Sequence, residues 1–94
     1  MTTMIGFHEV EDAAHWAKAW QKGPGSRHEM FAKAGVTGSR TFRDPENPEW
    51  VGVLFDVADM EKFQALMQSD EGKKAMAEDR LKVETLRILV EFTP

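Results

Sequence analysis

The sequence contains no cysteine. The chain therefore has no disulfide, no thiolate nucleophile and no zinc site of the cysteine type, so apolar packing must supply its stability. We expect a cytoplasmic protein, because a reducing compartment suits a chain without disulfides.

Long hydrophobic runs are also missing. Residues 51–55 form one of the longest, far short of the roughly 20 apolar residues that cross a bilayer, so the sequence predicts no membrane-spanning helix. Residues 1–6 lack the basic segment and apolar stretch of a signal peptide, and we expect none.

Positive charge is scarce. The chain has 12 lysines and arginines against 16 aspartates and glutamates, a formal net charge of -4, which argues against nucleic acid as a partner. Basic residues concentrate between Lys18 and Arg43, and acidic residues between Asp44 and Glu71. Two solvated faces are one explanation of this segregation, and complementary charge across a subunit contact is the other.

The composition is that of one globular domain spanning residues 1–94. Hydrophobic residues make up 41% and charged residues 30%, the balance of a chain that folds around a core. A chain of 94 residues has room for one such core.

Local patterns predict two similar halves, each with a strand, a broken helix and a second strand. Trp16 and Trp20 share one helical face, and Ser26 with Glu29 has the spacing of a capping box. The candidate helix caps are Glu11 or Asp12, Ser26, Asp56 or Asp59, and Ser69. The expected elements are strand 4–10, a helix from residue 13, helical piece 27–34, strands 36–43 and 50–57, a helix broken at residue 69, and strand 83–92.

This order predicts an α+β, ferredoxin-like βαββαβ fold, a four-stranded antiparallel sheet with the helices on one face. Because helices cover only one face, apolar residues of the other parity are left uncovered. We expect them to form a patch too large for a soluble monomer, so that a second copy covers the helix-free face and a small ligand binds between the two sheets. The residues assigned to this face are Met4, Val10, Trp50, Leu54 and Leu89.

Two segments resemble the dimeric α/β-barrel superfamily, and the resemblance extends over nearly the whole chain. They are residues 55–63, with the sequence Phe-Asp-Val-Ala-Asp-Met-Glu-Lys-Phe, and residues 69–76. This superfamily includes antibiotic-biosynthesis monooxygenases and stress-responsive A/B-barrel proteins. The resemblance implies a homodimeric barrel with a pocket. Its members include cofactor-independent oxygenases, polyketide cyclases, isomerases, haem-degrading enzymes and proteins without known activity, so it implies little about the use of that pocket.

His8 is the first candidate catalytic residue. The parity of the first strand assigns it to the helix-free face, where a histidine can act as a general base toward an acidic carbon or a phenol. The resemblance supports this role, since plant polyketide cyclases of the superfamily use a first-strand histidine. The chain has no tyrosine to serve as its usual partner. The alternative is a hydrogen-bonded interior histidine, or one at the strand end facing water.

Arg87 is the second candidate. Its position in the last strand aims it away from the helices, where a guanidinium can hold a carboxylate or stabilise an enolate oxygen. The alternative is a salt bridge to Glu9 or Glu91 of a second copy. Arg40 is a weaker candidate for the same binding role.

Aromatic and aliphatic side chains are candidate ligand walls. Trp50 opens a strand beside a loop and can stack on a flat substrate, with Leu54 and Leu89 on the same face. Trp16 and Trp20 have the spacing of core residues instead.

No cofactor or metal is expected from the sequence. His8, His15 and His28 do not have the spacing of the His-Glu-x-x-His zinc motif. Haem binding would require His15 or His28 to face the pocket from a helix. The main hypothesis is a small-molecule-binding dimeric α/β barrel that acts as a cofactor-independent monooxygenase or cyclase on an aromatic or polyketide-like substrate. The alternatives are a non-catalytic ligand carrier or a stress or regulatory dimer, and, more weakly, a haem-binding or haem-degrading protein.

Overall fold

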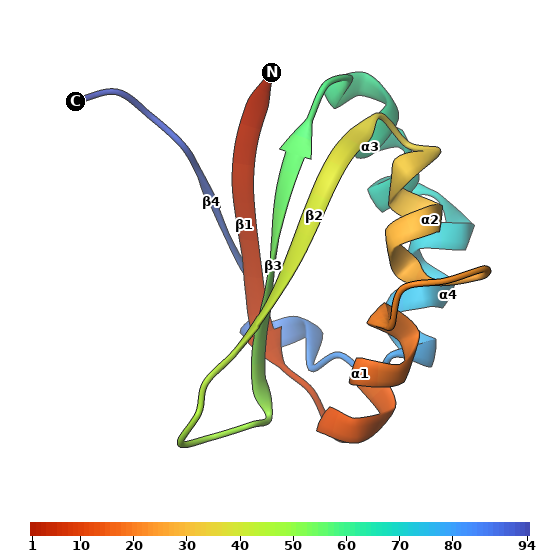
Figure 1. The fold of residues 1–94 in the computed structure, drawn as a ribbon, viewed down its shortest axis with the longest axis vertical. Coiled ribbons are helices and arrows are strands. Elements are labelled where there is room, and N and C mark those ends of the chain that lie inside the picture. The colour runs from red at the N-terminus through yellow and green to blue at the C-terminus, as the bar shows by residue number, and fades with distance from the viewer.

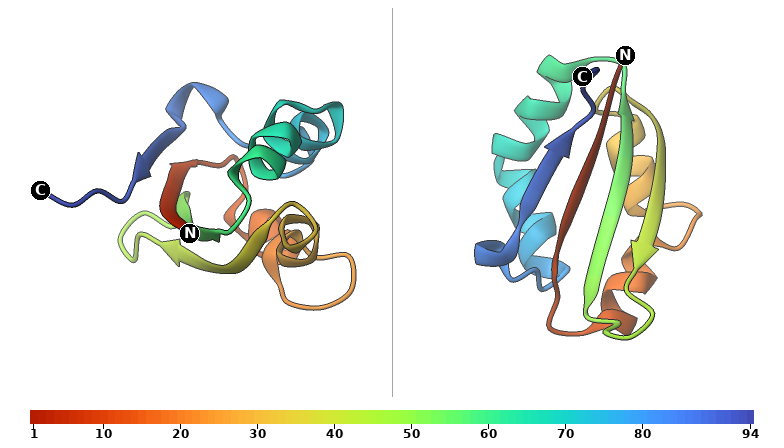
Figure 2. Two further views of the ribbon diagram at one scale, coloured as in Figure 1. Left: turned by 90° about the horizontal axis from the view of Figure 1, so that it is seen from above. Right: turned by 90° about the vertical axis from the view of Figure 1, so that its left-hand side faces the viewer.

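Four strands form one antiparallel sheet in the computed structural model, which describes residues 1–94. The strands lie in the order β2-β3-β1-β4, and all the long helices cover one face of the sheet (Figures 1 and 2). The predicted α+β ferredoxin-like fold is therefore confirmed. The strands are β1 (Thr2–Glu9), β2 (Val36–Arg43), β3 (Trp50–Val57) and β4 (Arg87–Val90), and the helices are α1 (Ala13–Trp20), α2 (Arg27–Ala32), α3 (Met60–Gln68), α4 (Asp70–Glu78) and the 3₁₀ helix η1 (Val83–Thr85).

A capping side chain starts each of the four α-helices, as the sequence predicted. Asp12, Ser26, Asp59 and Ser69 each accept a hydrogen bond from the backbone N–H three residues further on. Ser69 ends α3 and caps α4, which explains the break between these two helices. The longest helices have nine residues, and no helix has the length and apolar character needed to span a bilayer.

The core lies between the sheet and the helices. On β3, alternate residues from Val51 to Val57 point toward the helices and are buried, as the period of a strand with one covered face requires. Aromatic rings from α1, α2, α3 and β3 pack on one another, with centroid distances from 4.8 Å for Phe31 and Phe55 to 6.2 Å for Trp20 and Phe55. The rings of this cluster are Trp16, Trp20, Phe31, Phe55 and Phe63.

The last strand is shorter than predicted. Only Arg87–Val90 pair with β1, and the preceding residues 83–85 form the 3₁₀ turn η1. The hydroxyl of Thr85 explains this turn, because it accepts a hydrogen bond from the N–H of Glu9 and donates one to the carbonyl of Lys82. The hydroxyl thus takes the place of a strand carbonyl for the N–H of Glu9, while the N–H of Thr85 bonds to the Lys82 carbonyl within the turn.

The prediction that Met4, His8 and Val10 lie on the helix-free face was wrong. Met4 and His8 are only 8% and 5% exposed and lie beneath the helices, while Val10 is completely buried. The helix-free face of β1 instead carries Ile5 and Phe7. The error arose because both parities of this strand are apolar, so that alternation alone does not identify the covered face.

The prediction that Trp50, Leu54 and Leu89 lie on the helix-free face is confirmed. Strand pairing places Leu54 and Leu89 opposite Ile5 in neighbouring strands, and Trp50 lies beside Phe7 with the ring centroids 6.4 Å apart. Leu89 is 58% exposed in the single chain, so this face is both apolar and uncovered.

Candidate functional site

A small apolar cavity of about 70 Å³ lies between the sheet and the helix layer. One of its lining residues, Ile88 of β4, is exposed, while Phe63 on the same wall is buried. Among its 14 lining residues only His8 and Asp79 carry titratable side chains, so the chemistry of the cavity depends on these two groups. The aromatic side chains of the wall are Trp16, Trp20, Phe55 and Phe63, and its methionines are Met4, Met67 and Met76.

His8 points from β1 into this cavity. Its ring meets the ring of Trp16 edge to face, with centroids 6.3 Å apart and an interplanar angle of 73°. Its Nδ1 lies 3.3 Å from the backbone carbonyl of Glu9, while Nε2 makes no hydrogen bond to another protein group. In the neutral ring, Nδ1–H donates to that carbonyl, so Nε2 carries the free lone pair.

Burial lowers the pKa of His8 below its ordinary value of 6.5. The contact with the Glu9 carbonyl and the negative charge of Asp79 both act in the opposite direction, but the loss of hydration outweighs them. His8 is therefore neutral at pH 7. A neutral histidine with a free Nε2 has the protonation state and the lone pair of a general base.

We expect the free energy of unfolding to decrease as the pH falls below about 6.5, the pKa of His8 in the unfolded chain. Between that value and the lower pKa of the folded state, the unfolded chain binds a proton that the folded chain does not bind, and protonation favours unfolding. Above this window both states are neutral and His8 has no effect. Urea unfolding from about pH 5 to about pH 8 measures the decrease. A His8→Gln variant should lack this component, and equal pH slopes for the two proteins would contradict the prediction.

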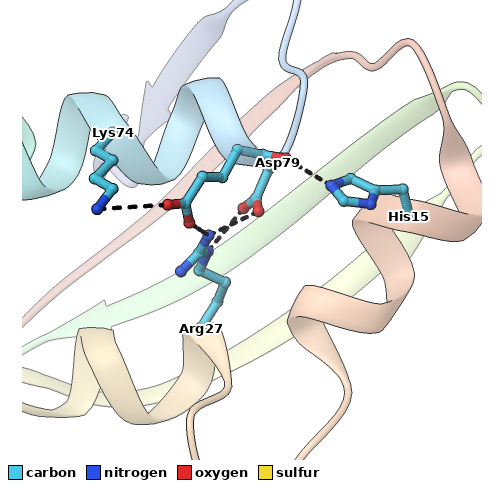
Figure 3. A network of polar contacts seen from close by, with 5 residues as sticks. His15, Arg27, Lys74 and Asp79 are labelled. Atoms are coloured by element: carbon cyan, nitrogen blue, oxygen red, sulfur yellow. Dashed lines mark hydrogen bonds and ion pairs between the residues drawn. The ribbon is translucent and has the colours of Figure 1, made fainter.

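Asp79 is the second polar group of the wall, at the end of α4. Its carboxylate is buried and accepts two hydrogen bonds of 2.9 Å from Arg27 at the start of α2, one from Nε and one from Nη2 (Figure 3). Nη2 of Arg27 also donates to Glu78 at 3.2 Å, and His15 of α1 contacts the Glu78 carbonyl at 2.6 Å. This network joins α1, α2 and α4 beside the cavity. The Asp79 carboxylate raises the pKa of Arg27 above its ordinary value.

Neither Arg27 nor Asp79 was a candidate from the sequence. A signal was nevertheless present, because a cation in the first turn of a helix and an anion at the end of a helix both oppose the helix dipole. Arg27 opens α2 and Asp79 follows the last residue of α4. Two such unfavourable positions indicate that each charge has a partner elsewhere, although 52 residues separate the two along the chain.

The structure does not bring His8 together with the other predicted site residues. Arg87 pairs with Phe7 in the strand register, so its side chain lies on the helix-free face, opposite His8. There its Nη1 donates to the Leu86 carbonyl at 2.9 Å, and the guanidinium carbon of Arg40 lies 5.7 Å from the Phe42 ring centroid. The predicted residues on this face are Arg87, Arg40, Trp50, Leu54 and Leu89.

The remaining histidines have structural contacts. His28 lies with Nδ1 2.7 Å from the hydroxyl of Ser39, and His15 joins the network at Glu78. Neither lines the cavity, which is the position that haem ligation from a helix would require. No three side chains of histidine, cysteine, aspartate or glutamate are grouped to hold a metal ion.

Comparison with known proteins shows similarity in structure without close similarity in sequence. No protein-family profile matches the chain, and no curated protein matches it significantly. SnoaB of Streptomyces nogalater, a cofactor-independent oxygenase, superposes with a TM-score of 0.72 at 13% identity over 99% of this chain and 92% of its own. A putative antibiotic biosynthesis monooxygenase of Nitrosomonas europaea has a TM-score of 0.70 at 11% identity, covering 99% and 98% of the two chains.

A putative antibiotic biosynthesis monooxygenase of Bordetella bronchiseptica gives the same TM-score of 0.70, at 16% identity over 99% of this chain and 96% of its own. Identities this low establish a shared fold and leave the reaction open. The sequence resemblance is thus confirmed at the level of structure. The chain has the ferredoxin-like fold of the antibiotic-biosynthesis monooxygenase proteins.

Proposed function

We propose that the protein is a cofactor-independent oxygenase or cyclase that acts on a small aromatic molecule in the cavity beneath the helices. The observation that carries this proposal is the free Nε2 of a neutral, buried His8 in a wall that is apolar apart from His8 and Asp79. Flat rings on that wall, such as those of Trp16 and Trp20, suit an aromatic ligand. The likeness in fold to a cofactor-independent oxygenase supports the same reaction class.

The size of the cavity limits the ligand. A cavity of about 150 Å³ holds benzene, so the cavity of about 70 Å³ admits one ring only when its walls give way. Met67 and Met76 are the side chains suited to this movement, because methionine is unbranched and only partly buried here. A single-ring substrate therefore fits the proposal better than a polyketide of several rings.

The first chemical step is proton removal. Nε2 of His8 takes a proton from a hydroxyl or an acidic carbon of the substrate, which leaves a substrate anion and an imidazolium ring. The negative charge of Asp79 stabilises that imidazolium, since it already favours the charged form of His8. In the oxygenase, dioxygen is the oxidant: a CH₂ carbon becomes C=O with one oxygen atom, and the two hydrogens leave with the other as water. In the cyclase, the carbanion attacks a carbonyl of the same molecule.

The test is a screen of single-ring aromatic compounds under air, with oxygen uptake and products measured for the wild type and for His8→Gln. Turnover that depends on His8 supports the proposal. Binding without oxygen uptake or a new product, for every compound that binds, supports the non-catalytic carrier instead. The carrier is favoured by the same apolar walls, because they suit retention of a ligand without chemistry.

We further propose that two copies associate through the helix-free face. Ile5, Phe7, Leu54 and Leu89 make this face apolar, and a patch of this kind in a soluble protein is usually covered. An interface between identical faces also places each patch against its equivalent.

We expect a Leu54→Lys variant to weaken the dimer by about 100-fold or more, because the lysine charge would be buried in the interface. Sedimentation at micromolar concentration measures the change. Gln64→Lys adds the same charge on the exposed side of α3 and should leave the dimer intact. A wild-type protein that sediments as a stable monomer would contradict the proposal.

A further inference from the structure

We propose that Asp79, held by Arg27, determines ligand specificity: it accepts a hydrogen bond from a ligand hydroxyl and excludes ligands that carry a carboxylate. This inference rests on the proposed binding of a small molecule in the cavity beneath the helices. It does not require that the bound molecule reacts.

Asp79 places an acidic side chain on the wall of the cavity. Its side chain is about nine-tenths buried, and it is the only acidic residue on the cavity wall. An aspartate is rarely buried without a partner, and here the partner is the bidentate Arg27. Because an aspartate in such a pair carries its charge, the cavity has a fixed negative group on one wall.

The carboxylate of Asp79 can accept more hydrogen bonds than Arg27 donates to it. A carboxylate has about four lone-pair positions, and Arg27 uses one on each oxygen, at 2.9 Å in both cases. No other protein donor bonds to these oxygens. The remaining positions are therefore available to a donor inside the cavity, such as the hydroxyl of a phenol.

The wall of the cavity carries no lysine or arginine. Arg27 does not line the cavity, and the only other titratable group of the wall, His8, is neutral. A ligand carboxylate would lose its hydration, meet the charge of Asp79 and find no cation in return. A neutral hydroxyl meets two acceptors instead, the Asp79 carboxylate and Nε2 of His8.

Three probes of similar shape test the inference: toluene, phenol and benzoate. Binding is followed by NMR through the Trp16 indole and the His8 ring, two groups of the cavity wall. We expect phenol to bind the wild type about 10-fold or more tightly than toluene, and benzoate to bind more weakly than either. In Asp79→Asn, the phenol preference should fall by about 10-fold and benzoate should gain relative to toluene.

Glu78→Gln is the matched control. Glu78 also bonds to Arg27, but it is half exposed and lies outside the cavity, so this variant should keep the wild-type preferences. If toluene binds but phenol has no advantage in the wild type, or keeps its advantage in Asp79→Asn, the inference is overturned while cavity binding stands. Wild-type benzoate binding as tight as that of phenol overturns it even if Asp79→Asn does not fold. If no probe binds the wild type, the inference and the proposed binding cavity both fail.

Discussion

A His8→Gln variant should lose turnover by a factor of about 10² to 10⁴, the usual contribution of a positioned general base. Glutamine retains polarity and approximate size, but its amide does not take a proton near neutral pH. The effect should appear in kcat, because proton removal belongs to the chemical step and little of the apolar wall changes. Steady-state kinetics on any compound that the wild type converts measures the loss.

The pH dependence of kcat/KM provides a second test of His8 as the base. For the wild type, kcat/KM should rise with pH and become level above a pKa lower than 6.5, because burial lowers the pKa of His8 and the base acts in its neutral form. His8→Gln should lack this rise. His15→Gln removes a histidine outside the cavity and should keep it. If His8→Gln retains wild-type turnover, His8 is not the base.

The placement of His8 beneath the helices also separates catalysis from dimerisation. A ligand that bound between two sheets, as the sequence predicts, would leave a lone subunit without a binding site. In the structure the cavity belongs to one chain, and the helix-free residues such as Leu54 are not part of it. Dimer formation through the helix-free face and binding beneath the helices are therefore independent proposals, and a monomeric Leu54→Lys variant should still bind a ligand.

The parts of the fold that the sequence predicted well depend on local signals. The bounds of β2 and β3 match the predicted residues 36–43 and 50–57, and the break at Ser69 follows from its hydroxyl group. The covered face of β1 did not follow, because Ile5 and Phe7 are as apolar as Met4. Local patterns decide where elements begin and end, while the choice between two apolar faces is made by packing.

The candidate site was likewise predicted only in part from the sequence. His8 was identified from its chemistry, since few side chains can take a proton near pH 7. Its neighbours were not identified, because Asp79 reaches the cavity only when α4 packs over the sheet and Arg27 meets it from another helix. The sequence places Arg87 beside His8 only if both face the helix-free side. In the structure Arg87 faces that side and His8 faces the helices, so the two are apart.

Replacing Arg27 with methionine should lower the free energy of unfolding by about 3 kcal/mol, because Asp79 is then buried without its partner. The loss is expected to exceed the few tenths of a kcal/mol regained by removing a cation from the start of α2. For a chain of this size the melting temperature should fall by about 10 °C or more. Urea unfolding followed by tryptophan fluorescence measures the change. Lys74→Met is the control, since its contact with Glu78 is an exposed pair at 3.9 Å and contributes at most about 0.5 kcal/mol.

The double variant Arg27→Met/Asp79→Leu separates the ion pair from the packing around it. Arg27→Met leaves Asp79 without its partner, and Asp79→Leu leaves Arg27 with only the half-exposed Glu78. The double change removes both charges and their desolvation cost. We therefore expect the double variant to be more stable than either single variant, and the two single losses to exceed the double loss by about 2 kcal/mol or more. Additive losses would mean that the two residues stabilise the helix layer separately. Coupled losses would mean that the pair stabilises the helix layer as one unit.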